Sequence, residues 1–216
     1  MSGGWPSWLT NATTIRTMPR PNKFEQAFEN LRAALWHPDL SEDFYFFNDD
    51  FFVMEPLQDL PVVHRGWVSD RIAEGGGGDT YRHGRSVTQN LLKTLLPARE
   101  DLLSYEAHAP MEFNTEALRA VLDLIGRHLP TSLATIAHWK TVYGNLAALG
   151  GRYIESPKAG GPPWPTPFMS TEDTAFEGEA GDYIRGLFPD PSPYEGDQCP
   201  APPSSPTSCV ELAARS

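Results

Sequence analysis

The strongest pattern along the chain is an apolar stripe of helical spacing in residues 23–36. Its apolar positions recur every three or four residues, at Phe24, Ala27, Phe28, Leu31 and Leu35. This spacing places the apolar side chains on one face of an α-helix, while most of the charged residues between them fall on the other. The pattern therefore predicts an amphipathic helix over residues 23–36.

Similar patterns predict the remaining helices. An apolar stripe follows Asn114, which is a residue type favoured at the N-cap, and Gly150-Gly151 marks a helix end. The predicted helices cover residues 86–96, the segment that starts after Asn114, residues 131–149 and residues 179–187. Residues 74–85 are glycine-rich and predict a flexible loop, but the Gly-Lys-Ser/Thr of a phosphate-binding P-loop does not follow them. The five prolines of residues 155–167 predict an irregular segment.

Two segments have the character of strands. Residues 44–47 read FYFF and residues 168–171 read FMST. A continuous apolar run is typical of a strand that is covered on both faces in an α/β sheet. Asn48, Asp49 and Asp50 follow the first strand directly, and ligands of open α/β sheets gather at the carboxyl ends of strands. The pattern predicts an α/β fold in which the strand carries the two carboxylates into a covered cleft.

Composition narrows the class of protein. The chain has 216 residues and a formal net charge of −11, which argues against a nucleic-acid partner. It contains no apolar run long enough for a membrane span, and its N-terminus lacks the features of a signal peptide. We expect a cytoplasmic protein in which residues 1–195 form one domain. Residues 196–216, rich in Pro and Ser and containing both cysteines, predict a disordered tail.

The adjacent carboxylates Asp49 and Asp50 are the leading candidates for chemistry. Two carboxylates at a strand end can hold a hard cation such as Mg²⁺ or Mn²⁺, which would neutralise the diphosphate of a nucleotide-sugar. The alternative is a simple strand-end turn, where Asn and Asp are favoured residues. The apolar segments on both sides favour the cation site, because a surface turn seldom lies between two such segments.

Four further residues are candidates, and each has a structural alternative. His108 precedes Ala-Pro and could act as a base on a sugar hydroxyl or donate to a phosphate; the alternative is a histidine hydrogen-bonded to a neighbouring loop. Arg65 and Lys140 could each contact phosphate. The alternative for Arg65 is a surface ion pair, and the alternative for Lys140 is a solvated side chain beside core aromatic residues. Asp173 could be a third carboxylate near the metal or a helix N-cap.

These segments together resemble a known family. GGWPSWLTNATTI, an amphipathic helix and HPDLSEDFYFFNDDFFVMEP resemble the second conserved region of the Stealth proteins, which are sugar-phosphotransferases. HAPM at residues 108–111 and FPDPSPYE at residues 188–195 look like later elements of that family, whereas STEDTAF at residues 170–176 matches only at Asp173. The chain is also similar to short phage-encoded proteins labelled glycosyltransferases.

The resemblance implies a Rossmann-like, GT-A-type α/β fold and a metal-dependent transferase. Its donor would be a nucleotide-sugar, its acceptor a glycan or another hydroxyl compound, and its cofactor Mg²⁺ or Mn²⁺, with attack on phosphorus and attack on the anomeric carbon both open. The family's first region would lie upstream of residue 3, so the resemblance implies an N-terminally truncated version of that fold. The residues that the resemblance carries over are Asp49 and Asp50, which would bind the metal, and His108, which would serve in transfer. Together with the candidates read from the residues themselves, we expect His108 and Asp50 to act in catalysis and Asn48, Arg65, Lys140 and Asp173 to contact the substrate.

Two rival functions remain open at the level of sequence. A degenerate family member without the first region could bind a glycan or a protein without catalysis. A metal-dependent phosphohydrolase would need more His and Asp ligands than the sequence offers in plausible spacing.

Overall fold

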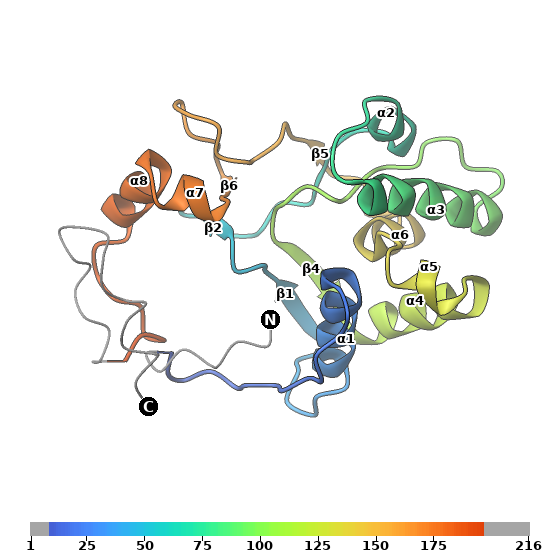
Figure 1. Ribbon diagram of the computed structural model, residues 1–216, viewed down its shortest axis with the longest axis horizontal. Helices are drawn as coiled ribbons and strands as arrows, with labels where there is room; N and C mark the ends of the chain where they lie inside the picture. The colour runs from blue at the N-terminus through green and yellow to red at the C-terminus, as the bar shows by residue number, and fades with distance from the viewer. Residues whose placement is uncertain (1–8, 197–216) are drawn as a thin grey trace.

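The structure is a computed structural model, and it describes residues 9–196 (Figure 1). The chain folds as a mixture of helices and short strands. Within the described residues the helices are α1 (Lys23–Leu35), α2 (Val68–Ala73), α3 (Asp79–Leu95), α4 (Thr115–His128), α5 (Thr131–Ala134), α6 (Trp139–Leu146), α7 (Asp173–Phe176) and α8 (Glu179–Leu187). The strands are β1 (Asp43–Phe46), β2 (Phe51–Val53), β3 (Val63–His64), β4 (Met111–Asn114), β5 (Arg152–Tyr153) and β6 (Phe168–Ser170).

The first helix is confirmed, and its boundaries have clear local causes. Asn22 is the N-cap of α1, and its side-chain oxygen accepts hydrogen bonds from the backbone N–H groups of Phe24 and Glu25, both at 3.0 Å. At the other end, Arg119 of α4 donates through Nε to the carbonyl of Leu35 at 2.9 Å. The same guanidinium lies 5.0 Å from the ring centroid of Trp36. These contacts fasten the end of α1 to α4.

The described strands form three small sheets of two strands each. β1 pairs with β4 and β2 with β6, both antiparallel, and β3 pairs with β5 in parallel. The expectation that residues 44–47 are covered on both faces is wrong, because Tyr45 is 48% and Phe47 is 45% exposed. Alternate side chains of β1 face the core and the solvent, as in an antiparallel ribbon with one covered face. The fold is therefore mixed α/β, built from short ribbons.

Two helix predictions need correction. The glycine-rich segment 74–85 is a loop only as far as Gly78, which is the N-cap of α3, so the predicted helix 86–96 begins at residue 79. The predicted helix 131–149 is interrupted between α5 and α6. The backbone N–H of His138 donates to the hydroxyl of Thr88 on α3 at 2.8 Å, which ties the interruption to the neighbouring helix. The spacing of apolar residues within segment 131–149 could not predict this contact, because its partner lies in another helix.

The other local predictions fare better. Asn114 is the N-cap of α4 and accepts a hydrogen bond from the backbone N–H of Ala117 at 3.0 Å, as predicted. The strand at 168–171 and the helix at 179–187 are confirmed as β6 and α8. Within residues 9–196, no helix is both long enough and apolar enough to cross a membrane. The predicted tail lies outside the described residues apart from residue 196.

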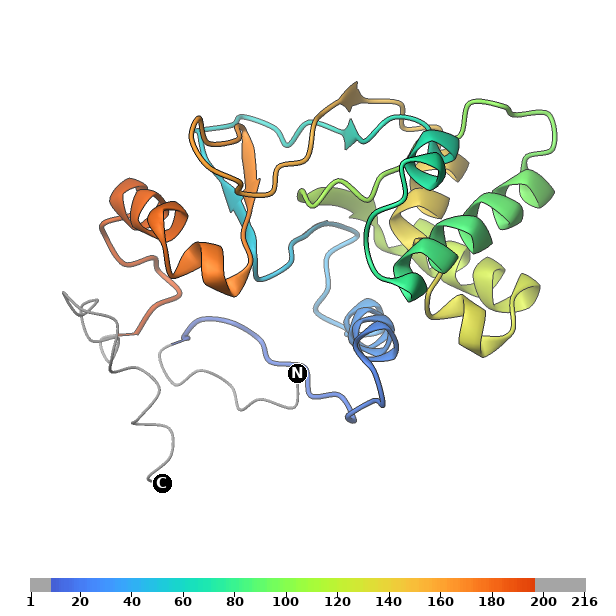
Figure 2. The same cartoon turned by 45° about the horizontal axis from the view of Figure 1, so that its top comes forward.

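The buried apolar side chains of the described residues form three clusters, one of which contains Val63, Ala107, Ala109 and Phe168. The main cluster lies among α1, α3, α4, α6 and the β1–β4 ribbon, with Phe113 and Leu118 fully buried. A smaller cluster contains Met54, Met169 and Ile184 and joins α8 to the β2–β6 ribbon. Figures 1 and 2 show α7 and α8 at one end and α3 to α6 at the other, with the segments that follow β1 and β2 running between them.

Candidate functional site

Helix α6 holds the chain segment that leads into the candidate site. Asn145 on this helix is buried, and its side-chain oxygen accepts from the backbone N–H of Leu103 at 3.0 Å while its Nδ2 donates to the Leu103 carbonyl at 2.7 Å. One turn earlier, the hydroxyl of Thr141 accepts from the backbone N–H of Tyr105 at 3.0 Å. These side chains substitute for a strand partner and hold the segment 103–105 against α6.

A glycine on the same helix lets this segment approach closely. A Cβ atom added at Gly144 would lie 2.5 Å from the ring of Tyr105. The Tyr105 ring therefore packs directly on the backbone of α6, and its hydroxyl donates to the carbonyl of Gly150 at 2.9 Å. These contacts place the residues that follow Tyr105, and two of them, Glu106 and His108, line the cleft described next.

A cleft of about 260 Å³ lies where this segment meets α1, α3 and α6. Three of the predicted residues line it, although they come from distant parts of the sequence: Asn48, His108 and Lys140. The remaining lining residues are Phe24, Ala27, Phe28, Phe46, Phe51, Tyr81, Glu106, Thr135, Ile136, Ala137, His138 and Trp139. The cleft thus joins predicted polar residues to a largely aromatic wall.

His108 is held in an uncommon backbone conformation. Its φ is +49°, in the left-handed region that non-glycine residues seldom adopt. Its Nδ1 atom is buried and has no hydrogen-bond partner among residues 9–196, and its ring lies edge-on to Phe51 with the centroids 6.1 Å apart. Burial lowers the pKa of His108, and the nearby Lys158 lowers it further. The imidazole is therefore neutral at pH 7, the state in which a histidine can accept a proton.

Lys140 is buried, and the alternative of a solvated lysine is wrong. Its ammonium lies 4.8 Å from the ring centroid of Phe46, 5.2 Å from that of Phe51 and 5.8 Å from that of Trp139. Rings at such distances attract a cation through their negative faces. Burial lowers the pKa of Lys140, whereas the carboxylates of Glu106 and Asp50 act in the opposite direction. The lysine side chain therefore ends in an aromatic box at the wall of the cleft.

The sequence prediction did not include four polar residues of the cleft lining, which are Tyr81, Glu106, Thr135 and His138. Glu106 is the one acidic residue of that lining. Its charge raises the pKa of Lys140, His108 and His138, although burial lowers all three overall. It also adds to burial in raising the pKa of Tyr81 to about 12. A signal was present in SYEAHAP, because polar and apolar residues alternate there and place Glu106 and His108 on the same side of an extended chain.

His138 and Tyr81 form the back of the cleft. Their ring centroids are 4.5 Å apart, and burial lowers the pKa of His138. A Cβ atom added at Gly84 of α3 would lie 3.0 Å from Nε2 of His138 and 2.3 Å from the Ile136 carbonyl. His138 therefore faces the backbone of α3, and its contribution is to the shape of the cleft.

The predicted carboxylates line a second, smaller cavity of about 180 Å³. Asp49, Asp50 and Asp173 lie around it together with Phe52, Thr171 and Phe176. Asp50 is half-buried, and its Oδ2 accepts a hydrogen bond from the hydroxyl of Ser170 at 2.8 Å. Asn48 and Phe51, which flank these two carboxylates in the chain, line the aromatic cleft, so the two cavities are adjacent. The charge of Asp50 accordingly acts to raise the pKa of His108 and of Lys140.

The carboxylates themselves are less covered than expected. Asn48, Asp49 and Asp173 are exposed, and Asp49-Asp50 forms a turn in which the N–H of Phe51 donates to the carbonyl of Asn48 at 3.2 Å. The expectation that the strand carries both carboxylates into a covered cleft is wrong for Asp49. The N-cap of α7 is residue 172, so Asp173 lies in the first helical turn and is not the cap.

Arg65 lies at the end of β3 and lines neither cavity. Its Nε is buried and has no hydrogen-bond partner. Burial lowers the pKa of Arg65, and the positive charges of Arg71 and Arg85 add to this effect. The structure does not bring Arg65 together with the other predicted residues.

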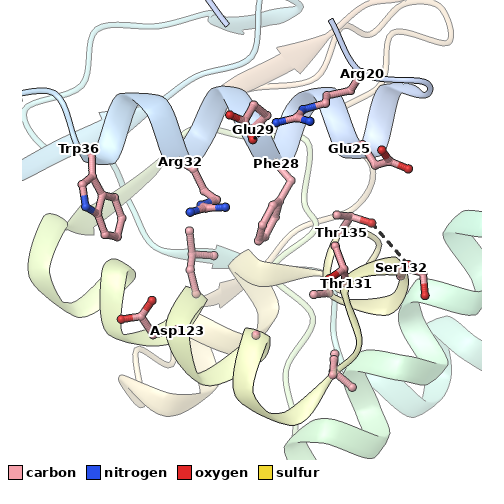
Figure 3. Close-up of a pocket in the computed structure, with 14 residues that line it drawn as sticks. Arg20, Glu25, Phe28, Glu29, Arg32, Trp36, Asp123, Thr131, Ser132 and Thr135 are labelled. Atoms are coloured by element: carbon pink, nitrogen blue, oxygen red, sulfur yellow. Dashed lines mark hydrogen bonds and ion pairs between the residues drawn. The ribbon is translucent and has the colours of Figure 1, made fainter. Parts of the chain in front are cut away.

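A larger cavity, of about 680 Å³, lies elsewhere, between α1 and the α4–α5 region (Figure 3). Phe28 projects into it from α1, and Arg20 pairs with Glu29 at 3.0 Å on its rim. Phe28 and Thr135 line both this cavity and the aromatic cleft, so the two spaces are adjacent. We favour the smaller cleft as the site, because it combines the strained histidine with the buried lysine.

Comparisons of the chain with protein-family models, with curated proteins and with solved structures found no match. The resemblance to the Stealth proteins therefore remains a prediction from the sequence motifs.

Proposed function

We propose that the protein is a transferase that uses a nucleotide-sugar donor and passes a sugar or a sugar-1-phosphate to a hydroxyl acceptor. The observation that carries this proposal is the convergence of Asn48, His108 and Lys140 in one cleft beside the cavity of Asp49 and Asp50. Such a grouping of a neutral base, a cation and carboxylates is typical of sites that transfer groups between oxygen atoms. The proposal includes the Rossmann-like, GT-A-type fold that the motifs imply.

A divalent cation is part of the proposal. The available protein ligands suit a site in which one or two carboxylates bind the cation together with water and substrate phosphates. Within residues 9–196, no group of three His, Cys, Asp or Glu side chains is arranged to bind a metal ion. Mg²⁺ is often bound by one or two carboxylates together with water and substrate phosphates. Asp49 and Asp50 fit that arrangement, with Asp50 oriented by Ser170. The bound cation would neutralise the donor diphosphate and stabilise the leaving group.

The chain's own residues have separable tasks in this proposal. His108, neutral at pH 7, would accept the proton of the acceptor hydroxyl as that oxygen attacks the donor. Lys140 would supply positive charge near the transferred group, and Asn48 would donate a hydrogen bond from the rim of the cleft. Strained backbone such as that of His108 persists where the surrounding structure holds it, and it clusters at active sites.

The test is calorimetric titration of the protein with UDP-, GDP- and CDP-sugars, with and without Mn²⁺. We expect one donor to bind only with Mn²⁺, and we expect Asp50→Asn to weaken that binding at least tenfold. Asp59→Asn is the matched control, because Asp59 is exposed and lines neither cavity. His108→Gln should leave donor binding unchanged.

The absence of donor binding by a folded protein under every condition would overturn the proposal. That result would favour the rival function of a non-catalytic glycan- or protein-binding module.

A further inference from the structure

The lining of the aromatic cleft holds one acidic and one basic side chain, Glu106 and Lys140. Glu106 supplies one negative charge, and Lys140 supplies at most one positive charge, because burial lowers its pKa while Glu106 and Asp50 oppose that effect. The other titratable residues of the lining are His108 and His138, neutral because burial lowers the pKa of each, and Tyr81, whose pKa of about 12 keeps it protonated. A diphosphate would bring at least two negative charges into this space beside a carboxylate. The cleft therefore suits an uncharged ligand.

Glu106 and Lys140 also remain available to a ligand. No salt bridge joins them, and none of the side-chain hydrogen bonds within residues 9–196 involves either residue. A half-buried carboxylate accepts hydrogen bonds strongly, and an ammonium donates them. The cleft thus offers one strong acceptor and one strong donor that the protein does not use internally.

The remaining wall is largely aromatic. Phe46 lies edge-on to Trp139 with the ring centroids 5.2 Å apart, and Phe51 completes the box around Lys140. A pyranose ring has hydroxyl groups at its edge and C–H groups on its faces, so it can pack on aromatic rings while its edge forms hydrogen bonds. The volume of about 260 Å³ lies below the range of about 300–1,000 Å³ that is usual for drug-sized ligands. It suits a single ring.

We propose that this cleft is a subsite for one uncharged sugar ring, with Glu106 as the residue that recognises its hydroxyl groups. If the protein is the proposed transferase, this sugar ring belongs to the acceptor, and that assignment rests on the proposed function. The donor diphosphate then lies on the other side of Asp50, at the carboxylate cavity. His108 lines the cleft, and the charge of Asp50 in the neighbouring cavity acts to raise the pKa of its imidazole.

The experiment is saturation-transfer NMR of the full chain with glucose, galactose, mannose and N-acetylglucosamine, without nucleotide or metal. We expect saturable binding of at least one sugar in the millimolar range. Glu106→Gln keeps the shape of the side chain but removes its charge, and it should weaken this binding about tenfold. Glu112→Gln is the matched control, because Glu112 is an exposed glutamate of β4 outside the cleft. Circular dichroism establishes that both variants are folded.

Three results would overturn the inference: no sugar binds saturably, Glu106→Gln binds as tightly as the control, or UDP without metal displaces the sugar. The donor titration described above reports separately on the proposed function. A protein that binds a donor but no free sugar retains the function and loses the subsite. A protein that binds sugar through Glu106 but no donor retains the subsite as a lectin-like site and loses the transferase.

Discussion

The contact between Asn145 and Leu103 allows a quantitative test of how the site is built. Asn145→Ala would remove both hydrogen bonds to the backbone of Leu103, at 3.0 and 2.7 Å, and a third to the carbonyl of Thr141 at 2.8 Å. The third loss adds little, because the Thr141 carbonyl still accepts the helical bond of its own turn. The first two leave a backbone donor and acceptor without partners in a partly buried segment.

The expected cost follows from these two groups. A hydrogen bond contributes about 1 kcal/mol net, and a buried group left without its partner costs about 1–3 kcal/mol. Asn145 is only 1% exposed, so water does not readily replace its side chain. We expect Asn145→Ala to lower the free energy of unfolding by about 3 kcal/mol. In a domain of this size, that loss corresponds to a fall in Tm of about 6–12 °C.

Urea unfolding followed by circular dichroism measures this difference. The control is Asn90→Ala, because Asn90 is exposed on α3 and its side chain forms no hydrogen bond in the structure. Its effect should stay within about 0.5 kcal/mol. If Asn145→Ala cost no more than Asn90→Ala, the segment that leads to the cleft would be held by other contacts, and the role assigned to α6 would be wrong.

Three further predictions concern packing and pH. Gly144→Ala places a methyl group against the ring of Tyr105 and should destabilise the protein by about 1–3 kcal/mol, as measured by urea unfolding. Burial lowers the pKa of His138 below its ordinary value of 6.5, so the histidine of the unfolded chain takes up a proton at a higher pH than that of the folded chain. The free energy of unfolding therefore falls as the pH drops below about 6.5. His138→Gln should reduce this fall, measured as the difference in unfolding free energy between about pH 7.5 and pH 5. Arg119→Met removes the hydrogen bond to the end of α1 and the contact with Trp36, and thermal unfolding should show a cost of about 1–2 kcal/mol.

The same contacts explain which parts of the site the sequence could predict. Asn48, His108 and Lys140 were recognised by residue type and position, and they do line one cleft. Glu106 was missed because a single glutamate two residues before a histidine has no distinctive spacing, although the alternation of Glu106 and His108 with alanines is visible in the sequence. Arg65 was included for its charge alone, and the path of the chain after β3 keeps it outside both cavities.

Local interactions determined the elements that the sequence predicted well. The apolar stripe of α1 with its Asn22 cap, and the Asn114 cap of α4, depend on residues within one or two helical turns, so they can be derived from the order of amino acids. Tertiary contacts decided the rest. The break between α5 and α6 depends on a hydrogen bond to Thr88. The exposure of β1 follows from its pairing with only one other described strand, β4. The cleft depends on the approach of segment 103–105 to α6. These features arise between segments that are far apart along the chain, and the periodicity of a single segment carries no information about its distant partner.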